Sequence, residues 1–244
     1  MNIPLSMGFS SYMANVGEVK NRGWEASLSA YIIRDQKKEF NWIINGQLVY
    51  NKNWISKLSE AIRSQNEIML TNDDYDVANL FYEGRPQNSI YAVRSLGIDP
   101  STGKEIYLDK DGNITDVWKA GDKVFLGSSE PLYRGIFGTM LMWKGFTLNV
   151  SFGCYWGGKT YNQTLLDRVE VPINNLRSSN ADRRVLTNRW LKPGDNTFFK
   201  GFTNETTRAT SRFVMDDNVL ELQSVNIVGT TIGFETKQES NLLL

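Results

Sequence analysis

The clearest pattern in the chain is a strict alternation of apolar and polar side chains from residue 146 to 156. A period of two is typical of a β-strand with one apolar and one polar face. The segment 135–143 alternates as well, and Lys144-Gly145 joins the two. A two-residue turn places Trp143 opposite Phe146 and keeps the apolar side chains of both segments on one face. The pattern therefore predicts a β-hairpin.

A second pair of alternating segments occurs at about 24–33 and 39–50, with a polar turn at 34–38 between them. It predicts another hairpin. A less regular segment at about 213–234 predicts a fifth strand around 219–228 and a sixth from Thr230 to Phe234. The expected fold class is all-β, with antiparallel strands of about ten residues, a length that suits a tilted crossing of a bilayer.

The connections between these strands alternate between short and long. The two short turns are followed by long connections at about 52–134 and 157–212. A soluble sandwich spaces its turns more evenly, whereas an outer-membrane barrel has short periplasmic turns and long extracellular loops. The spacing therefore favours a segment of a transmembrane β-barrel. A soluble carbohydrate-binding β-domain, whose apolar faces pack on each other, is the alternative.

In the barrel interpretation the apolar face contacts lipid and the polar face lines the lumen. Aromatic residues near both strand ends are compatible with the two girdles of such barrels, although aromatic residues also favour ordinary strands and cores. The side chains expected to face lipid are Trp24, Leu28, Ile32, Trp42, Ile44, Leu141, Trp143, Phe146, Leu148, Val150, Phe152 and Trp156.

Composition excludes several other classes of function. The formal net charge is zero, so no clustered basic surface argues for nucleic acid. The chain has no His, which removes His-based catalysis and His-ligated metal sites. Its single cysteine, Cys154, lies on the apolar face and is interpreted as a packed, inert thiol. The close carboxylate pairs fall in turns or at strand edges, so we expect no enzyme, cofactor or metal site.

Neither a transmembrane helix nor a leader is apparent in the sequence. No run of about 18 apolar residues occurs. The N-terminus lacks the basic and apolar regions of a signal peptide. On its own the chain would not be exported, so we expect it to be cytoplasmic or to be cut from a longer precursor.

The long connections contain local signals of their own. Residues 89–98 and 104–108 predict a small hairpin around the turn 99–103, and residues 55–63 predict a short helix. The segment 109–113 contains spaced aspartates but lacks the Gly and Glu positions of an EF-hand loop. A plain Asp-Gly turn is the better interpretation.

Several short sequence segments, which follow one another in a characteristic order, resemble one protein family. They are 15–25 (NVGEVKNRGWE), 51–53 (NKN), 83–86 (EGRP), 97–103 (GIDPSTG), 126–131 (LGSSEP), 157–159 with 161–162 (GGK, YN), 189–190 with 193–195 (RW, PGD) and 211–214 (SRFV). Together they resemble the C-terminal barrel region of the SusC/RagA family of TonB-linked outer-membrane transporters of Bacteroidetes. The resemblance covers nearly the whole chain.

The resemblance implies a 22-stranded barrel in the outer membrane that imports glycans, or in some members peptides, with energy relayed by the TonB complex. It also implies a SusD-like lipoprotein on the extracellular side. The chain departs from the family pattern, because it lacks a signal peptide, a TonB box and a plug domain. We therefore expect residues 1–244 to be a partial barrel domain, a fragment that does not transport alone.

In such a transporter, aromatic platforms and amide or charged groups on the extracellular loops would contact an oligosaccharide or peptide. Packing within the loops is the more ordinary role for each such side chain. The candidates with suitable chemistry are Trp118, Tyr133, Tyr161, Asn162, Arg189 and Trp190.

Overall fold

A computed structural model describes residues 17–73, 80–178 and 180–229. The expected strand from Thr230 to Phe234 lies outside these residues. The chain forms two compact units. The strand unit contains residues 24–50, 133–155 and 219–229. The loop unit contains residues 17–23, 51–132 and 156–218, apart from those not described.

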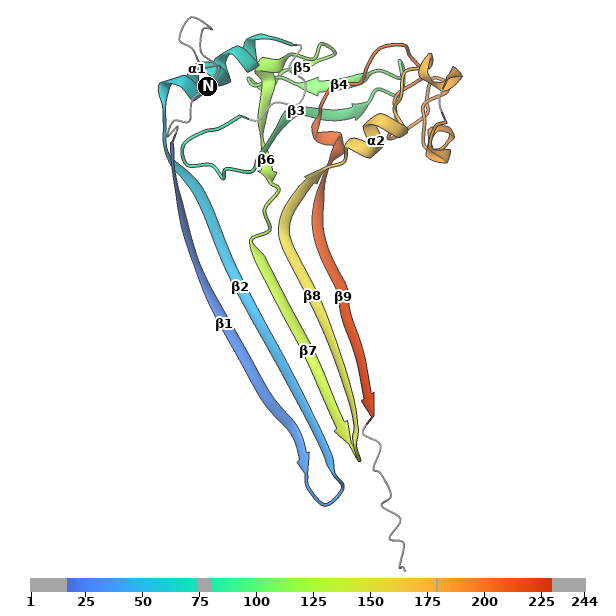
Figure 1. Ribbon diagram of the computed structural model, residues 1–244. Helices are drawn as coiled ribbons and strands as arrows, with labels where there is room; N and C mark the ends of the chain where they lie inside the picture. The colour runs from blue at the N-terminus through green and yellow to red at the C-terminus, as the bar shows by residue number, and fades with distance from the viewer. Residues whose placement is uncertain (1–16, 74–79, 179, 230–244) are drawn as a thin grey trace, which may run out of the picture. The chain divides into compact units, whose positions relative to one another are not determined.

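Five long strands form one sheet in the order β1-β2-β7-β8-β9 (Figure 1). Their bounds are β1 Gly17–Asp35, β2 Phe40–Leu58, β7 Tyr133–Trp143, β8 Phe146–Tyr161 and β9 Val214–Gly229. The predicted antiparallel all-β class is confirmed, since β2 and β7 pair antiparallel along their shared length. Several strands are longer than the alternation alone indicated.

The register of the sheet keeps the apolar side chains together. Trp42 lies opposite Leu141 and Gly46 lies opposite Phe137 in the β2–β7 pair. The rings of Phe137 and Phe152 stack with centroids 5.1 Å apart, which joins β7 to β8 on the same face. The turn residues between those strands, Lys144-Gly145, have φ values of 45° and 83°. Both are positive, as a type I′ hairpin turn requires.

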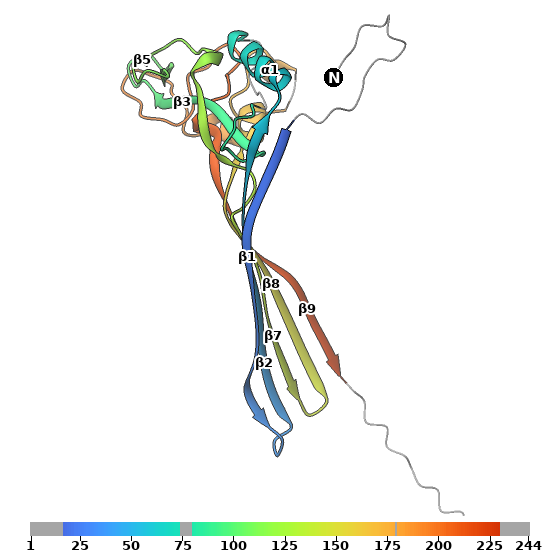
Figure 2. The same cartoon turned by 90° about the vertical axis from the view of Figure 1, so that its left-hand side faces the viewer.

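The strand unit is a single layer. Figure 2 shows its strands as one sheet, with no helix or further strand covering either face among the described residues. Of the buried apolar side chains in the described part of the chain, only Cys154 belongs to this unit, and it is 7% exposed. The thiol of Cys154 donates to the Gly135 carbonyl oxygen at 3.3 Å, consistent with a packed side chain. The strand unit therefore has no core of its own.

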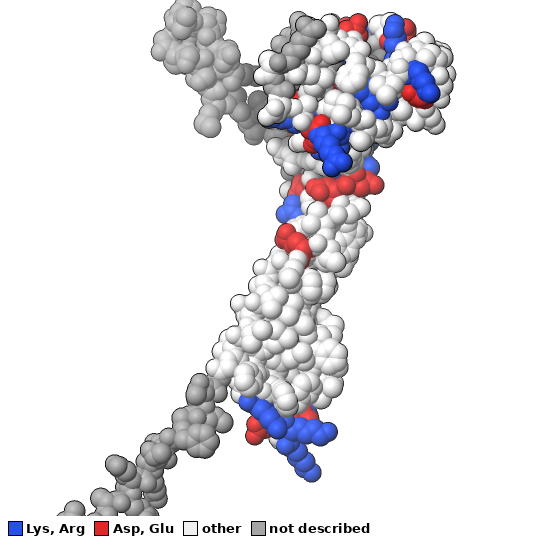
Figure 3. Space-filling model, turned by 90° about the vertical axis from the view of Figure 1, so that its right-hand side faces the viewer, with Lys and Arg blue, Asp and Glu red and all other residues white. Residues whose placement is uncertain are grey.

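Charged side chains in the strand unit gather at the short turns. Figure 3 shows a largely uncharged surface over the strands, with charges at one end. By sequence, the turn charges are Lys144 and those of segment 34–39. The remaining charges, Glu25, Arg134 and Glu221, occupy polar-face positions. Glu25 accepts a hydrogen bond from the Gln47 amide, and Glu221 lies with Gln223 beside Gly153. The apolar face is free of charge between the turns and the loop unit.

The loop unit contains a second, four-stranded sheet in the order β5-β4-β3-β6. Its strands are β3 Ser89–Ile98, β4 Glu105–Leu108, β5 Ile114–Thr115 and β6 Lys123–Ser128. The predicted β3–β4 hairpin is confirmed, with a bulge between Ser95 and Gly97. The helices are α1 Glu60–Thr71, α2 Gln163–Arg168, η2 Ala120–Asp122, η3 Asn175–Arg177, η4 Arg183–Leu186 and η5 Ser211–Phe213.

The prediction of a helix at 55–63 is wrong in its position. Strand β2 continues to Leu58, and helix α1 begins only at Glu60. The reason is a long-range backbone pairing that local sequence does not reveal. Ile55 donates its N–H to the Arg85 carbonyl and accepts from the Gly84 N–H, at 2.9 and 2.8 Å. These bonds keep the segment extended.

The loop unit carries nearly all the buried apolar side chains. One cluster packs Leu165, Leu166, Val169, Phe199 and Phe213. Two smaller clusters form around Tyr91 and around Trp118. The two long connections are thus folded structures with their own core, and they hold their polar side chains in fixed positions.

Candidate functional site

The first candidate site is the apolar face of the strand unit. Six side chains of the set expected to face lipid are exposed: Trp24, Leu28, Ile32, Trp143, Phe146 and, in the loop unit, Trp156. The other six, Trp42, Ile44, Leu141, Leu148, Val150 and Phe152, are half-buried by neighbours within the sheet. An extended apolar face left uncovered in this way fits contact with an apolar medium or partner.

Aromatic side chains also gather where the strand unit continues into the loop unit. Trp24 stacks on Tyr50 with ring centroids 6.1 Å apart. The ring centroid of Tyr50 in turn lies 5.1 Å from the ring centroid of Tyr133. Trp143 and Phe146 lie at the other end of the strands, beside the short turn. Aromatic side chains thus lie at two levels of the sheet, around Tyr50 and beside the short turn, an arrangement that fits the expected girdles.

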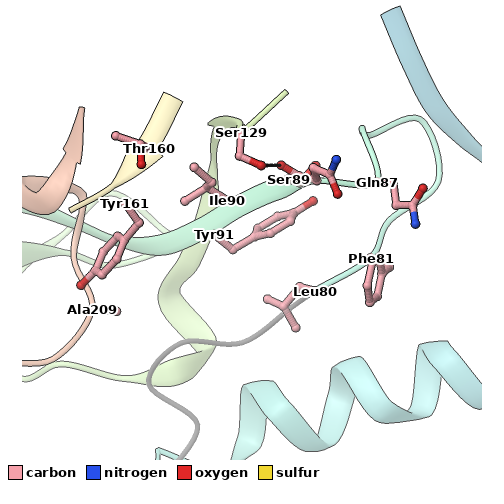
Figure 4. A pocket seen from close by; sticks show the side chains of 11 residues that line it. Leu80, Phe81, Gln87, Ser89, Ile90, Tyr91, Ser129, Thr160, Tyr161 and Ala209 are labelled. Carbon is pink, nitrogen blue, oxygen red and sulfur yellow. Dashed lines mark hydrogen bonds between the residues drawn. The ribbon is translucent and has the colours of Figure 1, made fainter. Parts of the chain in front are cut away.

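The second candidate site is a cavity of about 370 Å³ in the loop unit (Figure 4). Both long connections contribute to its lining. The first provides residues 80–81, 87–91 and Ser129, and the second provides 160–161 and Ala209. Because these segments are far apart in sequence, the cavity exists only in the folded loop unit.

The described residues that line this cavity include no charged side chain. Five described charged residues are next or nearly next to lining residues in sequence, but each interacts elsewhere. Glu83 pairs with Arg63 at 3.0 Å. Glu130 accepts a hydrogen bond from Asn53, and Lys159 pairs with Asp216 at 2.6 Å. Arg208 donates to the Asp73 carbonyl at 2.8 Å. The Arg85 guanidinium lies 4.5 Å from the centroid of the Phe125 ring.

Neutral polar groups line the cavity instead. The Tyr91 hydroxyl is buried and makes no hydrogen bond of ordinary geometry within the described chain. Burial raises the pKa of Tyr91 to about 12, so the phenol is neutral at physiological pH. The side chains of Gln87, Ser89 and Thr160 add an amide and two hydroxyls. The rings of Tyr91 and Tyr161 supply apolar surface beside these groups.

Tyr161 is the candidate from the sequence analysis that lines this cavity. It ends β8, and its ring packs edge-on against Phe213 with centroids 6.2 Å apart. Its neighbour Asn162 caps helix α2 instead, because its side-chain oxygen accepts from the Leu165 N–H at 3.0 Å. The amide nitrogen of Asn162 contacts the sulfur of Met215 at 3.5 Å. Asn162 therefore holds local structure.

Trp118 and Arg189 are both buried in the loop unit. The Trp118 indole N–H donates to the Ala209 carbonyl at 3.1 Å. Arg189 donates to the carbonyl oxygens of Val185, Lys200 and Val169 at 2.8, 3.1 and 2.5 Å. Burial lowers the pKa of Arg189. The polar groups of both side chains are thus engaged in holding loop segments together.

Trp190 lines a different cavity of about 640 Å³ in the loop unit. Its indole N–H donates to the Pro100 carbonyl at 2.9 Å, and its ring lies over Gly103. The charged residues of this lining are Lys104, Glu105, Asp116, Lys200 and Glu205.

Tyr133 belongs to the strand unit and contacts Tyr50, so the six candidates do not form one site. The predicted ligand contacts of the six stay predictions.

The segment around Asp195 is a folding element. The Asp195 carboxylate accepts hydrogen bonds from the N–H groups of Leu191 and Lys192, both at 3.0 Å. These two bonds lower the pKa of Asp195, Leu191 contributing most. Gly194 donates to the Pro100 carbonyl at 2.8 Å, which ties this turn to the β3–β4 hairpin.

Asp109 is likewise a turn residue. Its carboxylate accepts from the N–H groups of Asp111 and Asn113, at 2.9 and 2.7 Å. Gly112 in the same turn has φ of 89°. Throughout the described residues, no cluster of three or more Cys, Asp or Glu side chains is arranged to hold a metal ion.

Sequence reasoning missed a buried ionic cluster in the loop unit. Arg212 pairs with Glu105 at 2.8 Å and with Glu170 at 2.5 Å, and these side chains are 4%, 2% and 0% exposed. The Thr210 hydroxyl donates to Glu105 at 2.8 Å. Burial alone would lower the pKa of Arg212, but the hydrogen bonds from its guanidinium to the two carboxylates outweigh burial and raise it. The cluster joins the first connection to the second, at helix η5 just before β9.

The residues of the cavity around Tyr91 were also missed, apart from Tyr161. The sequence signal that could have found them is weak, because Gln87, Tyr91 and Thr160 belong to no common motif.

No helix among the described residues is long and apolar enough to span a membrane. The single-layered antiparallel sheet, its charge-free apolar face and its folded long loops together define the class: a segment of a transmembrane β-barrel wall.

Comparisons with known proteins agree with this class. No family model matches the sequence. TonB-dependent receptor P3 of Formosa agariphila is 26% identical over 242 residues, covering 92% of this chain and 23% of the receptor. TonB-dependent receptor SusC of Bacteroides thetaiotaomicron is 26% identical over 192 residues, covering 74% of this chain and 18% of SusC. The solved RagAB peptide transporter superposes with a TM-score of 0.71 at 22% identity, covering 93% and 24% of the two chains.

The chain is thus similar, over most of its length, to TonB-dependent receptors, SusC among them. It spans about a fifth to a quarter of the length of the relatives it matches. These relatives are receptors and transporters and not enzymes, in agreement with the sequence analysis.

Proposed function

We propose that the chain forms part of the barrel wall and extracellular loops of an outer-membrane importer driven through TonB. The observation that carries the proposal is the charge-free apolar face of the strand unit, which no second layer covers among the described residues. In water such a face would lose the stabilisation that burial gives, whereas a bilayer supplies it. The names of the relatives support the same conclusion.

The orientation follows from connection lengths. The short turns at 36–39 and Lys144-Gly145 face the periplasm, and the loop unit faces the outside. In the assembled importer the polar face of the strand unit lines the lumen. The imported substrate is a glycan or a peptide, and a SusD-like lipoprotein covers the extracellular side. The solved RagAB peptide transporter supports a peptide, and the resemblance of the sequence to the SusC/RagA family supports a glycan.

A pair of variants in β8 tests the membrane assignment. Val150 lies on the apolar face and Ser151 on the polar face, and both are half-buried. Val150→Arg should lower the free energy of unfolding in phospholipid vesicles by about 2–4 kcal/mol, while Ser151→Arg should change it little. Urea titrations of the 244-residue chain in vesicles, followed by tryptophan fluorescence, measure the difference.

A soluble carbohydrate-binding domain is the alternative, and it predicts a different result. Such a domain requires a second sheet packed on the apolar face, and the described strand unit has none. If the chain were soluble without detergent and unfolded in one cooperative transition, the importer assignment would be wrong. Equal effects of the two arginine variants would also contradict it.

A further inference from the structure

We propose that Lys20, Arg22 and Lys52 bind the phosphate of an anionic lipid headgroup. The three side chains belong to β1 and β2, in the part of these strands that lies in the loop unit, and all three are exposed. This inference rests on the proposed function, since it requires lipid against the apolar face of the strand unit. It goes further, because it names a lipid chemistry that the protein selects.

The two sides of β2 differ within the loop unit. On one side, the Asn53 side chain accepts a hydrogen bond from the Gln87 N–H at 3.1 Å, and Ile55 is 3% exposed. This side therefore faces the interior of the loop unit. Because successive side chains of a strand point to opposite sides, Lys52 and Trp54 point away from that interior. Lys52 is exposed there and Trp54 is half-buried.

The pairing of β1 with β2 decides which side chains are neighbours on this outward side. The two strands are adjacent in the five-stranded sheet. In the loop unit the Ser56 hydroxyl donates to the Glu18 carbonyl at 3.3 Å, and in the strand unit Trp24 stacks on Tyr50. Steps of two residues along both strands of an antiparallel pair lead from the first contact to the second. One continuous register therefore accounts for both.

This register places Arg22 beside Lys52, with Lys20 two residues further along the same side of β1. Like charges at opposite positions of a sheet repel and destabilise it. Glu18, on the same side of β1, pairs with Lys57 at 3.0 Å. No carboxylate of a described residue pairs with any of the three cations. An anion bound from outside the sheet would remove the repulsion between them.

The length of the apolar face gives the depth of these cations in a bilayer. On β2 this face extends from Phe40, beside the short turn, to Tyr50. At about 3.3 Å per residue, the stretch is about 33 Å long. With a strand tilt of about 40°, it spans about 25 Å of bilayer, the height of the apolar band in outer-membrane barrels. Lys52 is the next side chain on that side, so it lies where hydrocarbon gives way to headgroups.

Phosphate is the anionic group that these side chains suit. The Arg22 guanidinium can donate two parallel hydrogen bonds to phosphate oxygens, and the ammonium groups of Lys20 and Lys52 add charge. Their alkyl stems can lie along apolar surface while the charged ends reach the headgroups. The indole of Trp54 on the same side is a side chain typical of the membrane interface. The lipid therefore belongs to the leaflet on the loop side.

The short-turn end of the strand unit provides a contrast. There Lys38 pairs with Asp35 at 3.8 Å, and the Lys144 ammonium lies 5.5 Å from the centroid of the Trp143 ring. Cations at that end thus have partners within the strand unit. The outward cations of the loop unit are the better ligands for an anionic lipid.

Native mass spectrometry tests the inference on the 244-residue chain folded in micelles of a neutral detergent. Phosphatidylglycerol is the anionic probe, and phosphatidylcholine, whose headgroup has no net charge, is the reference lipid. We expect phosphatidylglycerol to bind more tightly by about 10-fold or more, since each basic side chain near a membrane surface strengthens binding of anionic lipid about 5-fold. Inorganic phosphate at the same concentration should not displace it.

Variants in the three cations locate the contact. Lys20→Gln, Arg22→Gln and Lys52→Gln should each weaken phosphatidylglycerol binding about 5-fold, and the triple variant on the order of 100-fold. Binding of phosphatidylcholine should change little. The matched control replaces by glutamine three exposed basic residues of the loop unit outside β1 and β2, namely Lys110, Lys119 and Arg183. It removes the same charge and should bind phosphatidylglycerol like the native chain. Unchanged circular dichroism shows that each variant folds.

The outcomes separate this inference from the proposed function. Equal binding of the two lipids, or equal losses in the triple variant and its control, would show that the three cations are not a lipid site. Displacement by inorganic phosphate would show a site for the free anion and would also contradict the inference. Insertion is measured separately in vesicles with Val150→Arg and Ser151→Arg. Normal insertion without lipid selectivity overturns the inference alone, whereas failure to insert overturns the proposed function.

Discussion

The indole N–H of Trp42 donates a hydrogen bond to the hydroxyl of Thr139, 2.8 Å away, on the apolar face of the strand unit. Trp42 lies on β2 and Thr139 on the neighbouring strand β7. A hydrogen-bonding group without a partner is costly in hydrocarbon, because no water is present to replace it. The bond therefore allows two polar groups to occupy a lipid-facing surface.

Replacing Thr139 by valine should destabilise the strand unit in vesicles by about 1–3 kcal/mol, since the indole N–H loses its partner. Thr147→Val is the control, because Thr147 lies at a polar-face position of β8. Urea titrations in vesicles compare the two. A loss at Thr147 as large as that at Thr139 would argue against lipid on the apolar face.

Replacing Arg212 by methionine should destabilise the loop unit by about 3–5 kcal/mol, because it leaves the carboxylates of Glu105 and Glu170 buried without a counter-charge. Arg183→Met, at an exposed position of η4, is the control and should have little effect. Changing Arg212, Glu105 and Glu170 together to apolar residues should recover much of the loss. Thermal unfolding monitored by circular dichroism measures all three. A small effect of Arg212→Met would show that the cluster is not structurally important.

Gly103→Ala should be more destabilising than Gly84→Ala. Both glycines have positive φ, 71° and 79°, so an alanine is strained at either position. Only at Gly103 would the added Cβ also overlap a side chain, the ring of Trp190, whereas Gly84 has open space. Unfolding titrations of the two variants give the loss of unfolding free energy for each. In a Trp190→Ala background the cost at Gly103 should fall to that at Gly84, and persistence of the difference would contradict the contact.

The stability contributed by Asp182 should depend on pH in the acid range. The side chain of Arg184, and then its backbone N–H, hydrogen-bond the carboxylate and lower the pKa of Asp182 to about 2. A lowered pKa in the folded state means that the contribution is complete above the unfolded value near 3.8 and is lost as pH falls through about 2. The difference in stability between the native chain and Asp182→Asn should therefore be constant from pH 7 to about 4. It should disappear toward pH 2, as unfolding titrations at each pH would show. A difference that persists at pH 2 would show that the carboxylate charge is not responsible.

The candidate residues show how far sequence reasoning reached. Trp118, Arg189 and Tyr161 have side-chain chemistry suited to a ligand, and sequence alone gives no means of separating them. The structure places Trp118 and Arg189 in the interior, where their polar groups bond backbone carbonyls, and places Tyr161 at a cavity. The difference arises from partners far along the chain. Trp118 bonds Ala209, 91 residues away, and no local pattern encodes that contact.

The sequence by itself determined the long strands of the strand unit, their two faces and the pairing of β7 with β8. The physical reason is that a period of two and a two-residue turn are local properties, specified by residues next to one another. Glu105, Glu170 and Arg212 show the opposite case. Their pairing spans 107 and 42 residues, and it depends on how the two long connections fold against each other. Only the tertiary structure therefore decided the ionic cluster, the start of helix α1 and the cavity around Tyr91.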